Sequence, residues 1–99
     1  MSGEFLHLID RAIREAEELR ARRQAGLDPG TVAQPEIAIR NLRALQGRTE
    51  RGDLELPTQR PSLGLVRFIG EWAEGTNLME TVREIERRWR EEARYAAHR

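Results

Sequence analysis

One stretch decides the fold, and it reads NLMETVREIERRWREEARYA from Asn77 to Ala96. Because an α-helix turns once in about 3.6 residues, apolar residues at steps of three and four share one face. Such steps separate Leu78, Val82, Ile85, Trp89, Ala93 and Ala96, which predicts a helix over 77–96. Glutamate and arginine pairs four positions apart, such as Glu86 with Arg90, are expected on its outer faces. Asn77 followed by Glu80 resembles a capping box and predicts where the helix begins.

A second long amphipathic stretch lies near the other end of the chain, over 4–25. Its apolar residues again recur at steps of four and three, at Phe5, Ile9, Ala12, Ala16 and Leu19. This spacing predicts a helix with one buried face. Gly26 follows the periodic stretch and is expected to end the helix in the left-handed conformation that glycine tolerates.

The middle of the chain predicts two shorter helices joined by a loop. Pro35 suits the first position of the second helix, expected over 34–47, and Ser62 is the expected N-cap of a helix over 62–74. Residues 52–61 contain two prolines and predict an extended loop, although alternating leucines also permit a short hairpin there.

These elements predict one all-α domain over residues 1–99. The turn residues Asp28, Pro29 and Gly30 reverse the chain after the first helix. We expect a small bundle of three to four helices, with the long first and last helices antiparallel and the extended proline-containing loop in the middle.

The composition excludes several classes of protein. The chain has 17 acidic residues and 17 arginines, but no lysine and no cysteine. Disulfide scaffolds, zinc–thiolate sites, cysteine nucleophiles and Schiff-base lysines are therefore excluded. Both halves of the chain are neutral, which disfavours electrostatic capture of nucleic acid or anionic lipid. Without a signal peptide or an apolar run of roughly 18 residues, we expect a cytoplasmic protein with no membrane contact. Arginine in place of lysine suggests a GC-rich bacterial genome.

No set of residues predicts catalysis. A nucleophile needs a base beside it, and the chain offers two histidines and two serines, half of them near the termini. Glu4, His7 and Asp10 have the spacing of metal ligands on a helix, but a solvated first turn explains them better. We therefore predict a protein that is not an enzyme, with no catalytic residues, no metal and no cofactor.

The large aromatic side chains serve either as core anchors or as part of an interface. We predict a partner-binding patch that consists of Leu63, Leu65, Phe68, Trp72 and Trp89. The apolar seam over 77–96 also looks too long for the second and third helices to cover, which favours a homodimer. The predicted function is a small non-catalytic protein-interaction module, such as an adaptor, inhibitor, chaperone-like or immunity-type protein, whose partner is another protein.

The alternative is a nucleic-acid-binding regulator, although nucleic acid is the less favoured partner. It would use an arginine face on the first two helices, consisting of Arg20, Arg22, Arg23, Arg40, Arg43 and Arg48. The alternative requires that these arginines converge on one exposed face with no acids among them.

Overall fold

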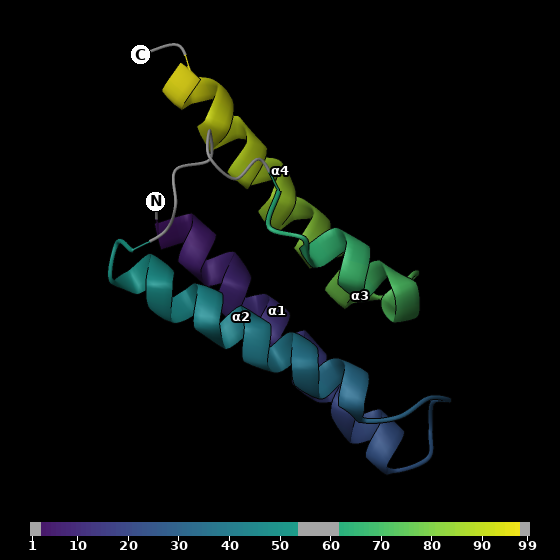
Figure 1. The fold of residues 1–99 in the computed structure, drawn as a ribbon. Helices are drawn as coiled ribbons and strands as arrows, with labels where there is room; N and C mark the ends of the chain where they lie inside the picture. Colours follow the sequence, from purple (N-terminus) through teal and green to yellow (C-terminus); the bar gives the residue numbers. More distant parts are fainter. Residues whose placement is uncertain (1–2, 54–61, 98–99) are drawn as a thin grey trace.

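The computed structural model describes residues 3–53 and 62–97, with side chains in the last helix described up to Glu91. The described residues form the helices α1 (Gly3–Gln24), α2 (Ala33–Glu50), α3 (Leu65–Ala73) and α4 (Asn77–Ala97), as Figure 1 shows. The predicted all-α bundle is confirmed. Most of the predicted loop over 52–61 lies outside the described residues.

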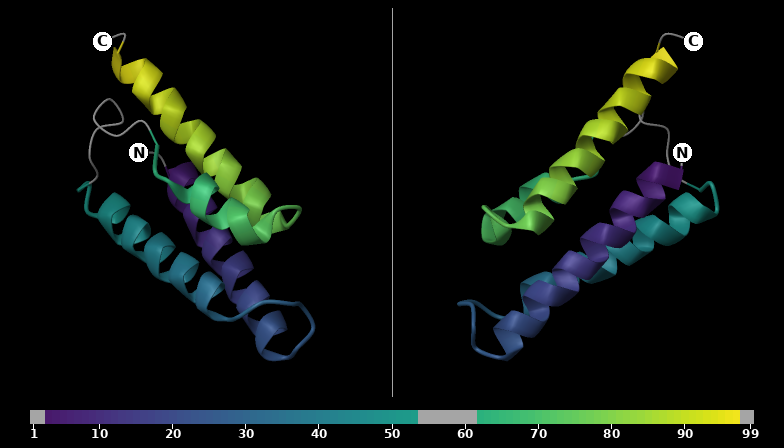
Figure 2. Two further views of the ribbon diagram at one scale, coloured as in Figure 1. Left: turned by 45° about the vertical axis from the view of Figure 1, so that its right-hand side comes forward. Right: turned by 180° about the vertical axis from the view of Figure 1, so that it is seen from behind.

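The four helices pack as two hairpins that meet through α1 and α4. The α1 helix lies along both α2 and α4, while α3 packs on α4. Figure 2 shows that α2 and α3 lie on the same side of the α1–α4 pair. Arg88 donates to Glu4 at 2.9 Å and Thr81 donates to Glu15 at 2.5 Å, so α1 and α4 run antiparallel, as predicted.

The core lies along the α1–α4 contact and takes residues from every helix. Fully buried side chains include Ile9 of α1, Leu42 of α2, Ile69 of α3 and Ile85 of α4. The α4 seam is covered within the chain from Leu78 to Trp89, because α1 packs along it. This cover comes from the predicted antiparallel packing of the first and last helices. A second copy over the remainder of the seam stays a prediction.

The end of α1 follows the local sequence signal. Gly26 has a φ of 73°, and its N–H donates to the carbonyl of Arg23. The N–H of Leu27 donates to the carbonyl of Arg22, which completes a Schellman motif. Glycine is needed here because other residues rarely adopt positive φ, so the predicted cap is confirmed.

Both predicted N-caps are wrong. Thr76 caps α4, since its hydroxyl accepts from the N–H of Met79 at 3.3 Å, while Asn77 is the first helical residue. The α3 helix begins at Leu65 after Gly64, whose φ is 76°, so Ser62 lies too far upstream to act as its cap. In α2, Pro35 is the third residue rather than the first, which was the predicted position. It is still in the first turn, where a missing N–H costs no helical hydrogen bond.

The molecule is elongated, with extents of 50 × 23 × 19 Å. The C-terminal end of α4 projects beyond the start of α1 in Figure 1. Among the described residues, no helix has the combined length and apolarity that crossing a membrane requires.

Candidate functional site: an open groove between α2 and α3

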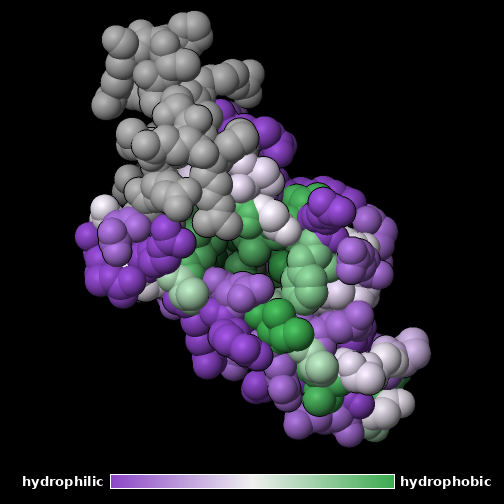
Figure 3. All heavy atoms as spheres, in the orientation of Figure 1, coloured by the Kyte–Doolittle hydropathy of each residue, from purple (hydrophilic) through white to green (hydrophobic). Residues whose placement is uncertain are grey.

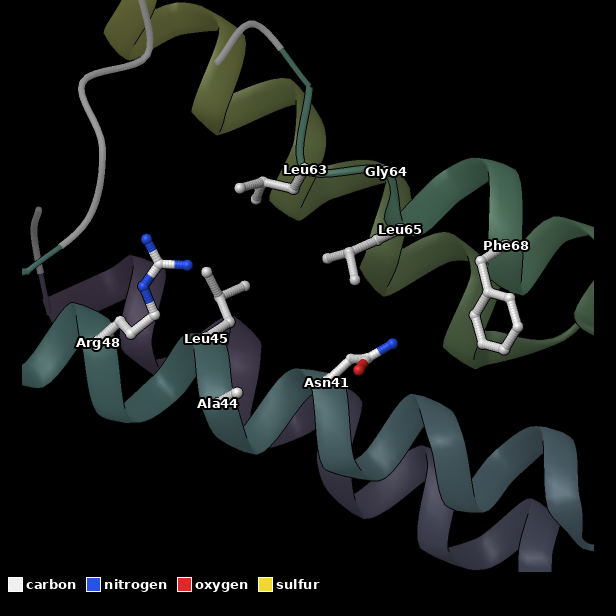
Figure 4. A pocket seen from close by; sticks show the side chains of 8 residues that line it. All are labelled: Asn41, Ala44, Leu45, Arg48, Leu63, Gly64, Leu65 and Phe68. Atoms are coloured by element: carbon white, nitrogen blue, oxygen red, sulfur yellow. The ribbon is translucent and has the colours of Figure 1, made fainter. Parts of the chain in front are cut away.

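A groove separates α2 from α3, which have fewer contacts with each other than any other packed pair of helices in the described chain. The groove encloses about 300 Å³. Hydrophobic residues gather in this hollow in Figure 3, and Figure 4 shows the side chains that line it. The lining residues are Asn41, Ala44, Leu45, Arg48, Leu63, Gly64, Leu65 and Phe68.

The wall on α2 is one stripe of the helix surface. Asn41, Ala44 and Arg48 are three and four positions apart, and therefore lie above one another on one face. Leu45 lies beside them and turns towards the core, where it is buried. One turn earlier, Ile37 extends the stripe and is 37% exposed, one of two large hydrophobic residues exposed among those described.

The opposite wall is formed by the start of α3. Leu63 and Leu65 are buried, and Phe68 is half-buried. Trp72 lies one turn further along α3, and its ring meets that of Phe68 edge to face at 6.3 Å between centroids. The two half-buried aromatic rings continue the apolar surface along α3.

A buried carboxylate on α4 positions this wall. Glu86 is 1% exposed, and its Oε1 accepts from the N–H of Leu63 at 3.0 Å and of Leu65 at 3.2 Å. Its Oε2 accepts from the hydroxyl of Ser62 at 3.4 Å. These bonds satisfy backbone donors at the start of α3, which the helix itself cannot do. Glu86 thereby fixes the residues that line the groove.

Sequence reasoning missed Glu86, which was expected on an outer face paired with Arg90. A signal was present in its spacing. Glu86 is four residues after Val82 and three before Trp89, so it lies beside the apolar stripe of the helix. A charged residue in such a position needs hydrogen-bond partners when it is buried, and the start of α3 provides them.

The far end of α3 is tied to the turn between α1 and α2. The guanidinium of Arg23 lies 5.2 Å from the centre of a Trp72 ring, a cation–π contact. The same guanidinium donates to the carbonyl of Thr31 at 2.7 Å and to Gln34 at 2.8 Å. The indole nitrogen of Trp72 is buried and has no hydrogen-bond partner. Arg23 therefore serves the fold and is not free for an external anion.

Among the residues that the structure describes, those lining the groove include a positive charge and no acidic side chain. Arg48 is half-buried at its edge and forms no ion pair with any described residue. Some arginines elsewhere are neutralised, as where Arg22 pairs with Asp28 at 2.8 Å and its hydrogen bond lowers the pKa of that carboxyl. Others, such as Arg20 and Arg40, also form no ion pair with a described residue. The groove therefore combines apolar walls with a cation that has no ion-pair partner among the described residues.

The predicted site residues separate into three places. Leu63, Leu65 and Phe68 gather at the groove and Trp72 adjoins it, whereas Trp89 is 1% exposed and packs on Phe5 in the core. Trp89 is thus a core anchor here. The six arginines of the alternative do not form an acid-free face, since Arg22 and Arg43 pair with Asp28 and Glu17. Arg20 and Arg40 do not line the groove, and neither forms an ion pair with a described residue.

The described residues offer no grouped metal ligands. Among them, no three His, Asp or Glu side chains are close enough to hold a metal ion. Glu4, the first residue of the ligand-like triplet, pairs with Arg88 instead. The groove itself presents an amide and a guanidinium, but no nucleophile or base.

A second hollow, of about 400 Å³, lies where charged residues of α4 face Val66. Arg87 and Arg88 hydrogen-bond to Glu84 and lower the pKa of that carboxyl to about 2. Arg87 also pairs with Glu91. The charges in this hollow are largely neutralised within the chain, which makes it a weaker candidate than the groove.

Comparison with protein-family models, curated proteins and solved structures found no match for this chain.

Proposed function

We propose that this chain is a non-catalytic protein-interaction module that binds another protein through the groove between α2 and α3. The observation that carries this proposal is the open space between the two helices, walled by Leu45, Leu65 and Phe68. Most other apolar surface of the bundle is buried within the chain. A bundle that leaves one seam open retains apolar surface that a partner can bury.

The shape of the groove suits side chains of a partner better than a free small molecule. A volume of about 300 Å³ is at the lower limit of small-molecule pockets, which span roughly 300–1,000 Å³. Small-molecule sites also bury most of their ligand, whereas this groove is open along one side (Figure 3). Trp72 and Arg48 are of the residue types that dominate binding energy at protein interfaces. Phenylalanine, as at Phe68, is enriched at such interfaces.

We also propose that the protein forms a homodimer and is located in the cytoplasm. A second copy of the chain could cover the projecting end of α4, as the predicted homodimer requires. The solution mass, measured by light scattering across a concentration series, tests this part. A mass that stays at 11.5 kDa over the whole series would reject the homodimer but not the groove.

Site-specific cross-linking tests the proposed function. Benzoylphenylalanine replaces Ala44 in the groove, and in a matched control it replaces Ala21, an exposed alanine of α1. Both variants are expressed in the cells that naturally make the protein and are irradiated. We expect position 44 to cross-link to one defined protein that position 21 does not reach. The purified pair must then bind in vitro. Equal cross-linking at both positions would contradict the proposal.

A further inference from the structure

We propose that the occupant of the groove is an acidic amphipathic helix of a partner protein, with a carboxylate placed to meet Arg48. This inference rests on the proposed function and adds the chemical class of the partner. The partner helix carries apolar residues at steps of three and four on one face, and acidic residues beside them.

The side chains on the two walls of the groove indicate that its occupant is a helix. The α2 stripe runs from Ile37 to Arg48, which at 1.5 Å per residue is a length of about 16 Å, or three helical turns. On the opposite wall, Leu65 and Phe68 of α3 line the groove at helical spacing, and Trp72 lies one turn beyond them. Two such rows of side chains form ridges on either side of the groove, and a third helix packs into grooves of this kind.

An extended segment fits the same groove less well. Its backbone N–H and C=O groups would need partners, as they find at the edge of a sheet. Apart from Leu63 and Gly64, the described lining residues belong to helices, whose interior backbone groups are already bonded within each helix. A docking helix brings its own backbone bonds with it and buries only side chains. The groove therefore favours a helix over a strand-like peptide.

The acidic character follows from charge complementarity. Among the described residues, the lining contains Arg48 and Asn41 as its polar side chains and no Asp or Glu, in a chain that has as many acids as arginines overall. A guanidinium binds a carboxylate through two parallel hydrogen bonds, and the bond strengthens when the site loses water. Arg48 is half-buried before any partner binds, so a docked helix would remove much of its remaining water. A basic helix in the same place would be repelled.

The test is a selection from a phage library of a helical scaffold randomised on its exposed positions. The library is selected in parallel on the unchanged protein, on Arg48→Glu and on Arg67→Glu. Arg67 is the matched control, because it is exposed on α3 and does not line the groove. We expect the unchanged protein and Arg67→Glu to enrich apolar stripes flanked by Asp and Glu, and Arg48→Glu to enrich Lys and Arg instead. The best acidic helix should bind Arg48→Glu at least tenfold more weakly.

Each other outcome has a definite meaning. If the three selections enrich the same balance of acids and bases, the inference is overturned. Binding of the selected helices to Ala44→Arg, which fills the groove from an exposed position, separates this failure from failure of the proposed function. If selected helices fail to bind Ala44→Arg but bind Arg48→Glu as well as they bind the unchanged protein, the groove is the binding surface but its partner is not acidic. Helices that bind Ala44→Arg as well as the unchanged protein would refute both.

Discussion

Replacing Glu86 with alanine should destabilise the protein more than the same replacement of any exposed glutamate would. The change leaves the backbone N–H groups of Leu63 and Leu65 without their acceptor, at a point where both residues are buried. An unsatisfied buried donor costs about 1–3 kcal/mol. The substitution adds this cost for two donors, but it also removes the cost of burying the Glu86 carboxylate. We therefore expect the free energy of unfolding to fall by about 2–4 kcal/mol. This loss is a large part of the free energy of unfolding of a small domain, which is roughly 5–15 kcal/mol.

Glu86→Gln sharpens this prediction. Both backbone donors bond to Oε1, so an amide oxygen in the same position can keep both bonds. The amide nitrogen would then take the place of Oε2, which accepts from Ser62 and more weakly from Leu63. We expect a loss of about 1–2 kcal/mol, between the unchanged protein and the alanine variant.

Urea unfolding followed by far-ultraviolet circular dichroism measures these losses. Glu18→Ala is the control, because Glu18 is exposed on α1 and should change stability by less than about 0.5 kcal/mol. Hydrogen exchange adds a local readout, in which the amide of Leu65 should lose protection in Glu86→Ala. The reasoning is refuted if Glu86→Ala unfolds at the same urea concentration as Glu18→Ala, or if exchange at Leu65 does not change.

Three further substitutions test the fold by the same unfolding assay. Trp89→Ala should cost about 3–5 kcal/mol, because it empties a fully buried site; a loss below 1 kcal/mol would place this ring elsewhere. Gly64→Ala should cost about 1 kcal/mol through its positive φ alone, since open space surrounds the added carbon, and no loss would contradict that conformation. Arg87 and Arg88 lower the pKa of Glu84 from 4.5 to about 2, so its contribution to stability is complete above about pH 5 and is lost as the pH falls towards 2. Glu84→Gln should remove this part of the acid sensitivity, and identical pH profiles would contradict the ion pairs.

The four helices and the end of α1 could be predicted because their causes are local. The steps between Leu78, Val82, Ile85 and Trp89 depend only on the pitch of a helix, and the structure places all four on the buried face. Gly26 ends α1 for a reason that concerns its own backbone.

The start of α3 could not be predicted in this way because its cause is distant in the sequence. Ser62 has the right residue type for an N-cap, yet the bonds that hold this region come from Glu86, more than twenty positions later. At α4, two capping residues stand side by side, and pattern alone does not choose between Thr76 and Asn77. The observed bond from Met79 to the Thr76 hydroxyl decides it.

The candidate site was predicted only in part. Leu63, Leu65 and Phe68 were expected at an interface, and the structure brings them to one groove. Arg48 and Asn41 on the opposite wall were not linked to them, because no pattern shows which faces of two helices confront each other. That relation depends on how α1 and α4 pack the two hairpins together.

The most direct test of the account is the affinity of the cross-linked partner, once purified, for two matched variants. Isothermal titration calorimetry measures Kd for the unchanged protein, for Ala44→Arg in the groove and for Ala21→Arg on α1. The account predicts at least tenfold weaker binding for Ala44→Arg and a Kd within about twofold of the unchanged value for Ala21→Arg. Equal affinity of the two variants, both folded by circular dichroism, would contradict the claim that the groove is the binding surface.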